Sequence, residues 1–202
     1  MNNYILIIAV AVITIIIVFV LKMIGDKYFE KMSKALEEKD FETFNKISDT
    51  KISRLIFSPF NLNYLKFNAA IAGEDENEIE TCLKCFDYTK IIDSQKDEIY
   101  SCAFNYYMSK NNYEKANEYK NKILNESNNI ELRDQVVKMY DIYALKSIDY
   151  LDELLIECEE TDDKERGFVE RLICETYKNL GDPVNSKKYN ELSLRHFEMM
   201  KK

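Results

Sequence analysis

Glycine and proline are scarce in this chain, with only 4 Gly and 2 Pro among 202 residues. β-Sandwiches and β-barrels need turn residues about every 8–12 positions. Nucleotide-binding α/β folds need glycine-rich loops. Neither requirement is met, so we expect an all-α fold.

Positive charge is also in short supply, because 28 Lys and Arg stand against 36 Asp and Glu, for a formal net charge of −8. A nucleic-acid-binding protein needs a basic face to neutralise phosphates, so we expect no nucleic-acid partner. Hydrophobic residues make up 46% and charged residues 32% of the chain. That balance is typical of a globular fold rather than of a disordered chain.

Catalytic motifs are lacking, since the sequence has no Gly-rich phosphate loop, nucleophile elbow or zinc-protease pattern. The single histidine, His196, has no candidate nucleophile close to it in the sequence, and a structural or surface role is predicted for it. We therefore expect no enzymatic activity, no cofactor and no metal site.

The cysteines are odd in number and fall inside helical patterns, whereas a disulfide framework usually has an even count. We interpret them as reduced core thiols. The pair Cys82 and Cys85 has the spacing of a redox or metal motif, but no further ligand lies near it, and packing is the favoured interpretation. The five are Cys82, Cys85, Cys102, Cys158 and Cys174.

A long apolar run, Tyr4 to Met23, stands near the start of the chain, with Thr14 and Lys22 as its polar members. As a helix it would reach roughly 30 Å, the thickness of a bilayer's hydrocarbon core. No basic residue precedes it and no small-residue cleavage site follows it, so a signal peptide is disfavoured. The sequence predicts a transmembrane anchor in residues 1–25 and a separate body in residues 26–202.

The flanking charges of the run predict its orientation. Lys22, Lys27, Lys31 and Lys34 follow its core, and only the α-amine precedes it. Under the positive-inside rule the body lies in the cytoplasm. We expect a single-pass protein of the cell membrane that contacts lipid through residues 4–23.

Short polar breaks recur through the body at a nearly constant spacing, and each is followed by a residue expected near the start of the second helix of a pair. The successive separations are 38, 34, 35 and 35 residues. A period near 34 residues is typical of stacked helix-turn-helix repeats. The five marker residues are Phe41, Ile79, Tyr113, Ile148 and Pro183.

The third repeat shows the pattern most clearly. Tyr100, Ala103 and Tyr107 advance by three and four positions, so they form one apolar face of its first helix. Tyr113 and Ala116 open its second helix, and the small Ala116 lets the two helices approach closely. In these positions the chain resembles the tetratricopeptide repeat family.

The resemblance implies an α-α hairpin solenoid of about five helix pairs. Phe44 in the first repeat and Leu151 in the fourth depart from the family, because a small residue is expected there. A solenoid of another α-α kind is the alternative.

In tetratricopeptide proteins the first helices of successive repeats line a concave surface, where partners bind as extended peptides or helices. The resemblance implies that a protein or peptide partner binds the polar and aromatic residues of that face. These residues are Glu98, Ser101, Asn105, Ser109, Arg133, Tyr140, Tyr143, Arg171, Glu175 and Lys178.

These features together predict a membrane-anchored adaptor or scaffold that holds a protein or peptide partner at the cytoplasmic face. Two alternatives stay open. One is a regulator that senses a short peptide. The other is an accessory subunit of a membrane complex, although the apolar run has no G-x-x-x-G face or internal charge to support specific helix packing.

Overall fold

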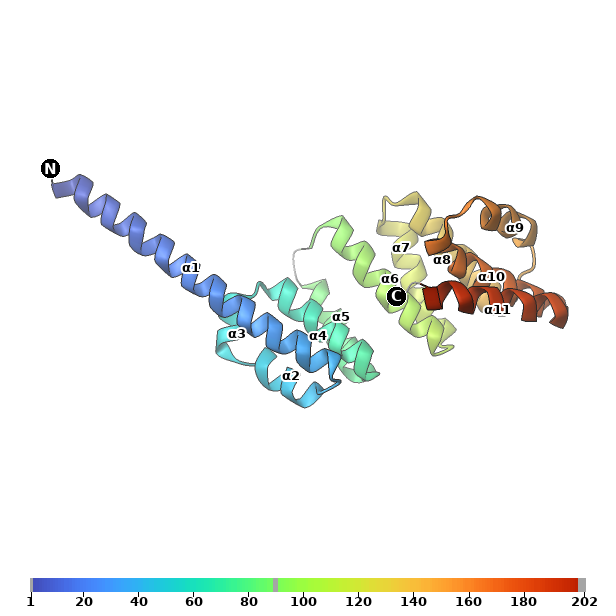
Figure 1. Cartoon of the computed structure of the whole chain (residues 1–202), viewed down its shortest axis with the longest axis horizontal. Coiled ribbons are helices and arrows are strands. Elements are labelled where there is room, and N and C mark those ends of the chain that lie inside the picture. Colours follow the sequence, from blue (N-terminus) through green and yellow to red (C-terminus); the bar gives the residue numbers. More distant parts are fainter. Residues whose placement is uncertain (1, 89–90, 200–202) are drawn as a thin grey trace. The chain divides into compact units, whose positions relative to one another are not determined.

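The computed structural model describes the backbone of residues 2–88 and 91–199, and the side chains of residues 13–88, 91–162 and 165–199. That part of the chain contains eleven helices and no strand, which confirms the predicted all-α class (Figure 1). The helices are α1 (Asn2–Glu37), α2 (Phe41–Ser48), α3 (Lys51–Ile56), α4 (Pro59–Gly73), α5 (Glu76–Asp87), α6 (Asp93–Ser109), α7 (Tyr113–Glu126), α8 (Ile130–Tyr143), α9 (Leu151–Glu160), α10 (Asp163–Leu180) and α11 (Pro183–Met199).

Helix α1 is the longest element, with 36 residues, and it passes without a break from the apolar run into the body. From Ile13 to Leu21 this helix extends beyond the helices that pack on its second half, and its large apolar side chains are exposed (Figure 1). Within the described residues, no helix has both the length and the apolar composition that crossing a membrane requires. Residues 4–12 of the predicted span lie outside the residues whose side chains are described.

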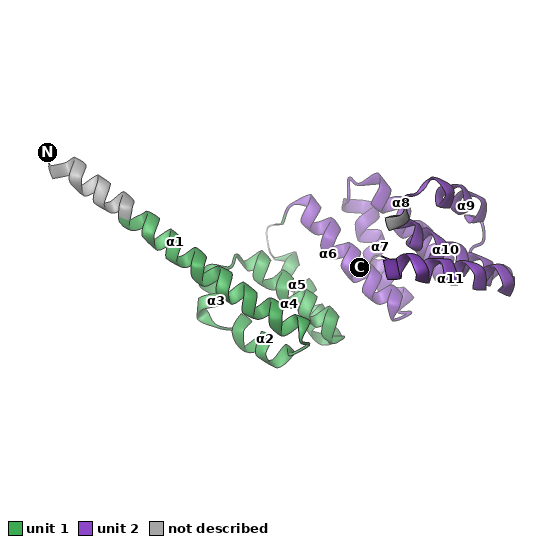
Figure 2. Cartoon of the chain, viewed as in Figure 1, with its two compact units in different colours: residues 1–91 green, residues 92–202 purple. Residues whose placement is uncertain are grey.

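The chain forms two compact units, residues 1–91 and 92–202 (Figure 2). In unit 1, α2 and α3 pack on α1, and α4 packs on α2 and α5. Phe44 is fully buried there, in a cluster with Met32, Ala35 and Ala69. The two alanines leave room for the large ring, which explains how Phe44 fits where the repeat pattern calls for a small residue.

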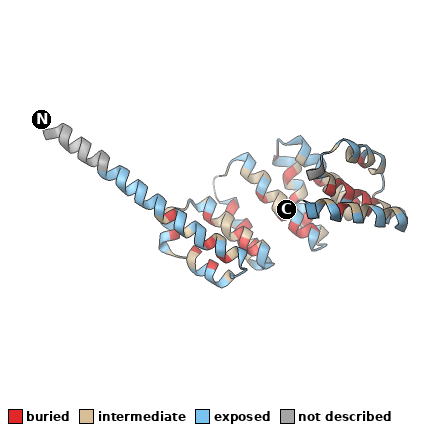
Figure 3. Ribbon diagram, in the orientation of Figure 1, coloured by how far each residue is buried: buried red, intermediate tan, exposed pale blue. Residues whose placement is uncertain are grey.

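In unit 2, α7 packs on α6 and on α8, and α10 packs on α8, α9 and α11. The core contains Ile142, Leu154, Val169, Leu172 and Ile173, all at most 2% exposed. Figure 3 shows the buried positions gathered on the faces where helices meet, as expected for amphipathic helices.

A recurrent turn closes the helix hairpins. Each of five turns contains one residue of positive φ, and the successive separations are 35, 37, 35 and 35 residues. In four of them the next residue is Asp or Asn, whose side chain accepts a hydrogen bond from the backbone N–H three residues on. The positive-φ residues are Lys39, Glu74, Asn111, Lys146 and Gly181.

The backbone hydrogen bonds in those four turns are also alike. Asp40 N–H donates to Ala35 O and Lys39 N–H to Leu36 O, and the same pair of bonds recurs before α5, α7 and α11. This is the Schellman arrangement that ends a helix at a left-handed residue. The period near 35 residues therefore has a local cause, because the same residue types form the same turn in four of the five repeats.

The predicted second helices begin close to their marker residues. Helices α2, α7 and α11 start at Phe41, Tyr113 and Pro183, as expected. Helix α5 starts shortly before Ile79, and α9 starts shortly after Ile148. Helix α3 was not expected, and it occupies the longer link between the first two repeats.

Candidate functional site

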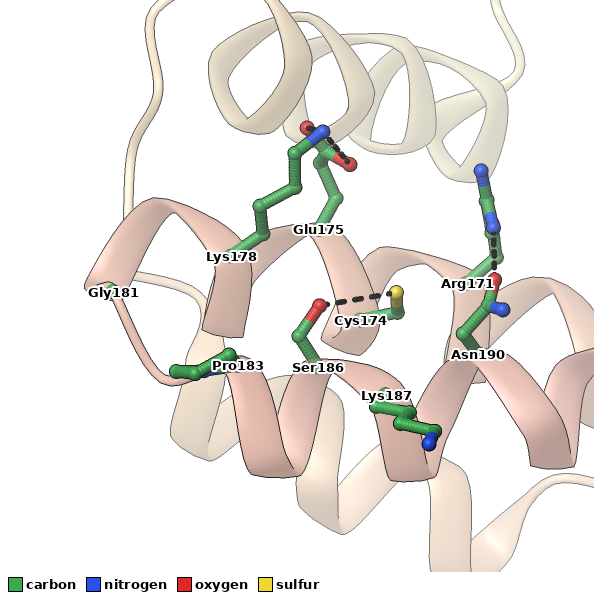
Figure 4. A pocket seen from close by; sticks show the side chains of 9 residues that line it. All are labelled: Arg171, Cys174, Glu175, Lys178, Gly181, Pro183, Ser186, Lys187 and Asn190. Atoms are coloured by element: carbon green, nitrogen blue, oxygen red, sulfur yellow. Dashed lines mark hydrogen bonds and ion pairs between the residues drawn. The ribbon is translucent and has the colours of Figure 1, made fainter.

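The hairpin of α10 and α11 contains an open groove with a volume of about 600 Å³ (Figure 4). Two sets of four side chains line it, and within each set the spacing is three, one and three residues. That spacing puts each set on one face of its helix. The lining residues are Arg171, Cys174, Glu175 and Lys178 of α10, Gly181 of the turn, and Pro183, Ser186, Lys187 and Asn190 of α11.

Polar contacts join the two helices across the floor of the groove. The guanidinium of Arg171 donates to Asn190 Oδ1. The Sγ of Cys174 lies 3.6 Å from the Oγ of Ser186 (Figure 4). Both contacts hold side chains of α10 against side chains of α11 among the residues that line the groove.

The charge of the groove is mainly positive. Arg171, Lys178 and Lys187 contribute three cations, and Glu175 contributes one carboxylate. The Glu175 side chain is only 8% exposed, and Lys178 Nζ lies 3.2 Å from it, with Lys146 Nζ at 3.6 Å. A locally basic groove thus exists in a chain whose formal net charge is −8.

Tyr143, at the end of α8, lies beside the groove residue Arg171. Burial raises the pKa of its hydroxyl, while the charge of Arg171 and a hydrogen bond with it act in the opposite direction. Asn179 of α10 donates to Ile142 O at 2.8 Å, which ties the two helices together beside it. The hydroxyl of Tyr143 is therefore neutral at physiological pH and lies next to the guanidinium.

The structure brings together four of the ten predicted binding residues. Tyr143 contacts Arg171, and Arg171, Glu175 and Lys178 line the groove. The other six do not line it. Glu98, Ser101, Asn105 and Ser109 lie on α6, and Arg133 and Tyr140 lie on α8.

Several of those six side chains are engaged locally. Ser101 Oγ donates to Asp97 O at 2.6 Å, and Ser109 Oγ donates to Tyr106 O at 2.7 Å. The ammonium of Lys120 lies 3.9 Å from the ring centroid of Tyr140, a cation–π contact. These residues remain predictions as partner contacts.

Sequence reasoning missed half of the groove because it considered only the first helix of each pair. Ser186, Lys187 and Asn190 come from α11, the second helix. Counted from Pro183, these residues have the same spacing as the four groove residues of α10. That shared spacing is the sequence signal that could have identified the α11 side of the groove.

The Cys82 thiol and the His196 imidazole both lie in surroundings that give them a packing role. Cys82 is 3% exposed, and burial, with the charge of Glu78 as the next cause, raises the pKa of its thiol to about 12. His196 Nδ1 lies 2.7 Å from Glu170 Oε2 and joins α11 to α10. Within the described residues no cluster of His, Cys, Asp and Glu is arranged to hold a metal ion.

Comparison of the chain with protein-family models, curated proteins and solved structures finds no match. The interpretation of the groove therefore depends on its own chemistry. It offers cations for carboxylates, amide and hydroxyl groups for a peptide backbone, and no group positioned as a nucleophile with a base beside it.

Proposed function

We propose that the chain is a single-pass membrane-anchored adaptor, a helical-repeat solenoid that holds a protein or peptide partner at the cytoplasmic face of the membrane. Residues 4–23 are the anchor in this proposal, and the helical body is the binding scaffold. No catalysis, cofactor or nucleic acid is involved.

The observation that carries the proposal is the continuity of α1. One helix runs from the apolar run into unit 1, where Met32 and Ala35 are buried against α2 and α4. A helix has no flexible joint unless a kink interrupts it. The body of unit 1 is thus attached to the apolar run through a rigid element, which suits a protein that acts by being held in place.

The recurrent turns support the solenoid part of the proposal. Five turns with a positive-φ residue, spaced 35 to 37 residues apart, recur along the chain, and four of them share one capping and hydrogen-bonding pattern. A single helix pair cannot bury its apolar face alone, so such units stack on their neighbours. The tetratricopeptide resemblance points the same way.

The charge of the groove between α10 and α11 supports a protein or peptide as the partner. Its cations outnumber its one carboxylate, and that carboxylate is already paired with Lys178 and Lys146. Carboxylates on a partner are the groups that Arg and Lys side chains bind best. An acidic segment of a partner protein therefore fits the groove better than a basic one.

Cross-linking in the native membrane tests this function. We expect the wild-type chain to cross-link to a partner. The double variant Lys178→Glu with Lys187→Glu should no longer form that cross-link. Arg195→Glu is the matched control, since Arg195 is exposed on α11 but does not line the groove. Equal recovery of the same partner by the charge-reversal variant and the control would exclude the groove as the binding site.

A further inference from the structure

Helix α3 is short but firmly placed. Thr50 Oγ1 accepts a hydrogen bond from Ser53 N–H at 3.1 Å and caps the helix. Ser53 Oγ donates to Ile47 O at 2.7 Å, and Ser53 is fully buried. These bonds connect α3 to the end of α2, so the side of α3 that faces solvent is defined.

That solvent-facing side combines apolar and basic side chains. Leu55 is 77% exposed and Ile52 is 45% exposed. Lys51 and Arg54 are also exposed, and neither forms an ion pair within the part of the chain that the structure describes. No acidic residue occurs between residues 50 and 59, so α3 itself is basic in an acidic protein.

The position of α3 along α1 is defined by one close contact. A Cβ atom built on Gly25 would lie 2.8 Å from Ile56 Cγ2, so α3 touches the backbone of α1 there. Gly25 comes two residues after Met23, the end of the apolar run, which is about 3 Å along the helix. The headgroup layer of a bilayer is roughly 5–7 Å thick on each side.

We propose that α3 is a second membrane contact, whose exposed face rests on an anionic phospholipid surface where α1 leaves the bilayer. This inference depends on the proposed anchoring of residues 4–23. Leu55 and Ile52 enter the boundary between headgroups and acyl chains, and Lys51 and Arg54 bind lipid phosphates. Apolar residues beside cations are the features that hold interfacial helices on anionic membranes.

The charges favour a lipid surface over a protein partner at this site. Lys22 and Lys27 of α1 lie within a turn of Gly25, so four basic residues and one acidic residue, Asp26, lie near the end of the apolar run. Anionic lipids present a dense negative surface at that level, and each basic residue near it strengthens association roughly five-fold. The contact would limit tilting of α1 and of unit 1 with it in the bilayer.

Tryptophan fluorescence tests the inference, because the chain contains no Trp. Three single-Trp variants of the full chain are reconstituted into phosphatidylglycerol-containing vesicles that hold lipids with a quencher either near the headgroup or deep in the acyl chain. Leu55→Trp reports on α3 and Ile15→Trp on the anchor. Val184→Trp, at a position 76% exposed in unit 2, is the matched solvent control.

We expect the shallow quencher to act most strongly on Leu55→Trp and the deep quencher on Ile15→Trp, with Val184→Trp unaffected by either. Quenching of Ile15→Trp without quenching of Leu55→Trp would overturn the α3 contact and leave the anchor intact. Absence of quenching at both positions would overturn the anchor as well. A blue-shifted Leu55→Trp that lipid quenchers do not affect would mean that a protein surface, such as a second copy, covers α3.

Charge reversal tests the role of the lipid headgroup. In the Leu55→Trp background, Lys51→Glu with Arg54→Glu should weaken the association roughly five-fold for each charge lost. Lys39→Glu with Lys84→Glu is the matched control, because both lysines are exposed elsewhere in unit 1. Replacement of phosphatidylglycerol by phosphatidylcholine should lower Leu55→Trp quenching in the same way. Equal quenching in both lipids and in both charge variants would overturn the anionic-surface proposal.

Discussion

His196 and Glu170 form a close pair between the last two helices, with Nδ1 of the imidazole 2.7 Å from Oε2 of the carboxylate. The Glu170 side chain is only 3% exposed, and that of His196 is 14% exposed. Ser193 Oγ donates to Gly167 O at 2.7 Å one turn away, so these two contacts add to those in the groove in holding α11 on α10. The lone histidine is thus part of the packing of the hairpin that forms the groove.

Removal of the Glu170 carboxylate should destabilise this hairpin. We expect Glu170→Ala to lower the free energy of unfolding by about 2 kcal/mol, because hydrogen bonds to charged groups contribute roughly 1.5–3 kcal/mol. Thermal unfolding followed by circular dichroism measures the change. Glu191→Ala, at an exposed position of α11, is the control and should change stability by less than about 0.5 kcal/mol. Equal effects of the two substitutions would show that the pair with His196 contributes nothing.

Gly25 should tolerate no side chain while Ile56 is present. Gly25→Ala places a Cβ 2.8 Å from Ile56 Cγ2, and overpacking of this kind costs about 1–3 kcal/mol. That cost exceeds the gain of about 0.5–1 kcal/mol from replacing a helical glycine by alanine. Chemical denaturation of the chain in detergent should therefore show a loss of stability.

The control for this prediction is the double variant Gly25→Ala with Ile56→Ala, compared with Ile56→Ala alone. The clash is absent in that background, so alanine at position 25 should be neutral or stabilising. Gly73→Ala is a second control, since its nearest neighbour, Phe41, lies at 3.4 Å. A Gly25→Ala variant as stable as wild type would contradict the close packing of α1 on α3.

At the positive-φ positions of the recurrent turns, replacing a residue by glycine and replacing glycine by alanine should change stability in opposite directions. Lys39 has φ of 56°, a conformation that costs a non-glycine residue about 1–2 kcal/mol. Lys39→Gly should relieve this strain and stabilise the chain by about 0.5 kcal/mol after the entropy of glycine is counted. Calorimetric melting of the two proteins compares them directly.

Gly181, with φ of 79°, is the reverse case. No atom lies within 4 Å of a Cβ built there, so Gly181→Ala should cost about 1 kcal/mol through backbone strain alone. Gly181→Asn should cost less, because Asn adopts the left-handed conformation more readily. A stabilising Gly181→Ala would refute this account of the turn.

The buried thiol of Cys82 should react slowly. Its pKa of about 12 leaves it protonated at physiological pH, and the thiolate is the reactive form. Alkylation of the native chain with N-ethylmaleimide, followed by peptide mapping, should leave Cys82 unmodified while the denatured chain is labelled there. Rapid labelling of native Cys82 would revive the redox interpretation of its pairing with Cys85.

The same shift predicts how stability depends on pH. The unfolded thiol loses its proton near pH 9, and the folded thiol loses it only near pH 12. Between these values the unfolded state binds fewer protons, so the contribution of Cys82 to stability falls as pH rises. Cys82→Ala should flatten that part of the stability profile.

The helices themselves were largely predictable, because their boundaries depend on local chemistry. Asp182 with Pro183, and Ser58 with Pro59, each combine an N-cap residue with a proline suited to the first helical position, and α11 and α4 begin at these prolines. In both cases the capping side chain accepts a hydrogen bond from the backbone three residues on. Helix α3 was missed since its six residues are too few to show a period.

The candidate site was predictable only in part. Arg171, Glu175 and Lys178 were assigned by analogy to one helix face, and they do line the groove. Lys187 and Asn190 were not assigned, because only the first helix of each pair was considered. Their spacing from Pro183 marks one face of α11, but it does not tell which helix that face packs on.

The sequence by itself determined the all-α class, the 35-residue period and the division into an apolar run and a polar body. Each follows from interactions between residues a few positions apart, in caps, turns and helix faces. Only the tertiary structure decided that α3 touches α1 at Gly25 and that three cations and one buried carboxylate share a groove. Those features depend on which helix faces meet. One pattern of helices allows many packings, and the volumes of the side chains and the pairing of buried polar groups determine which packing is stable.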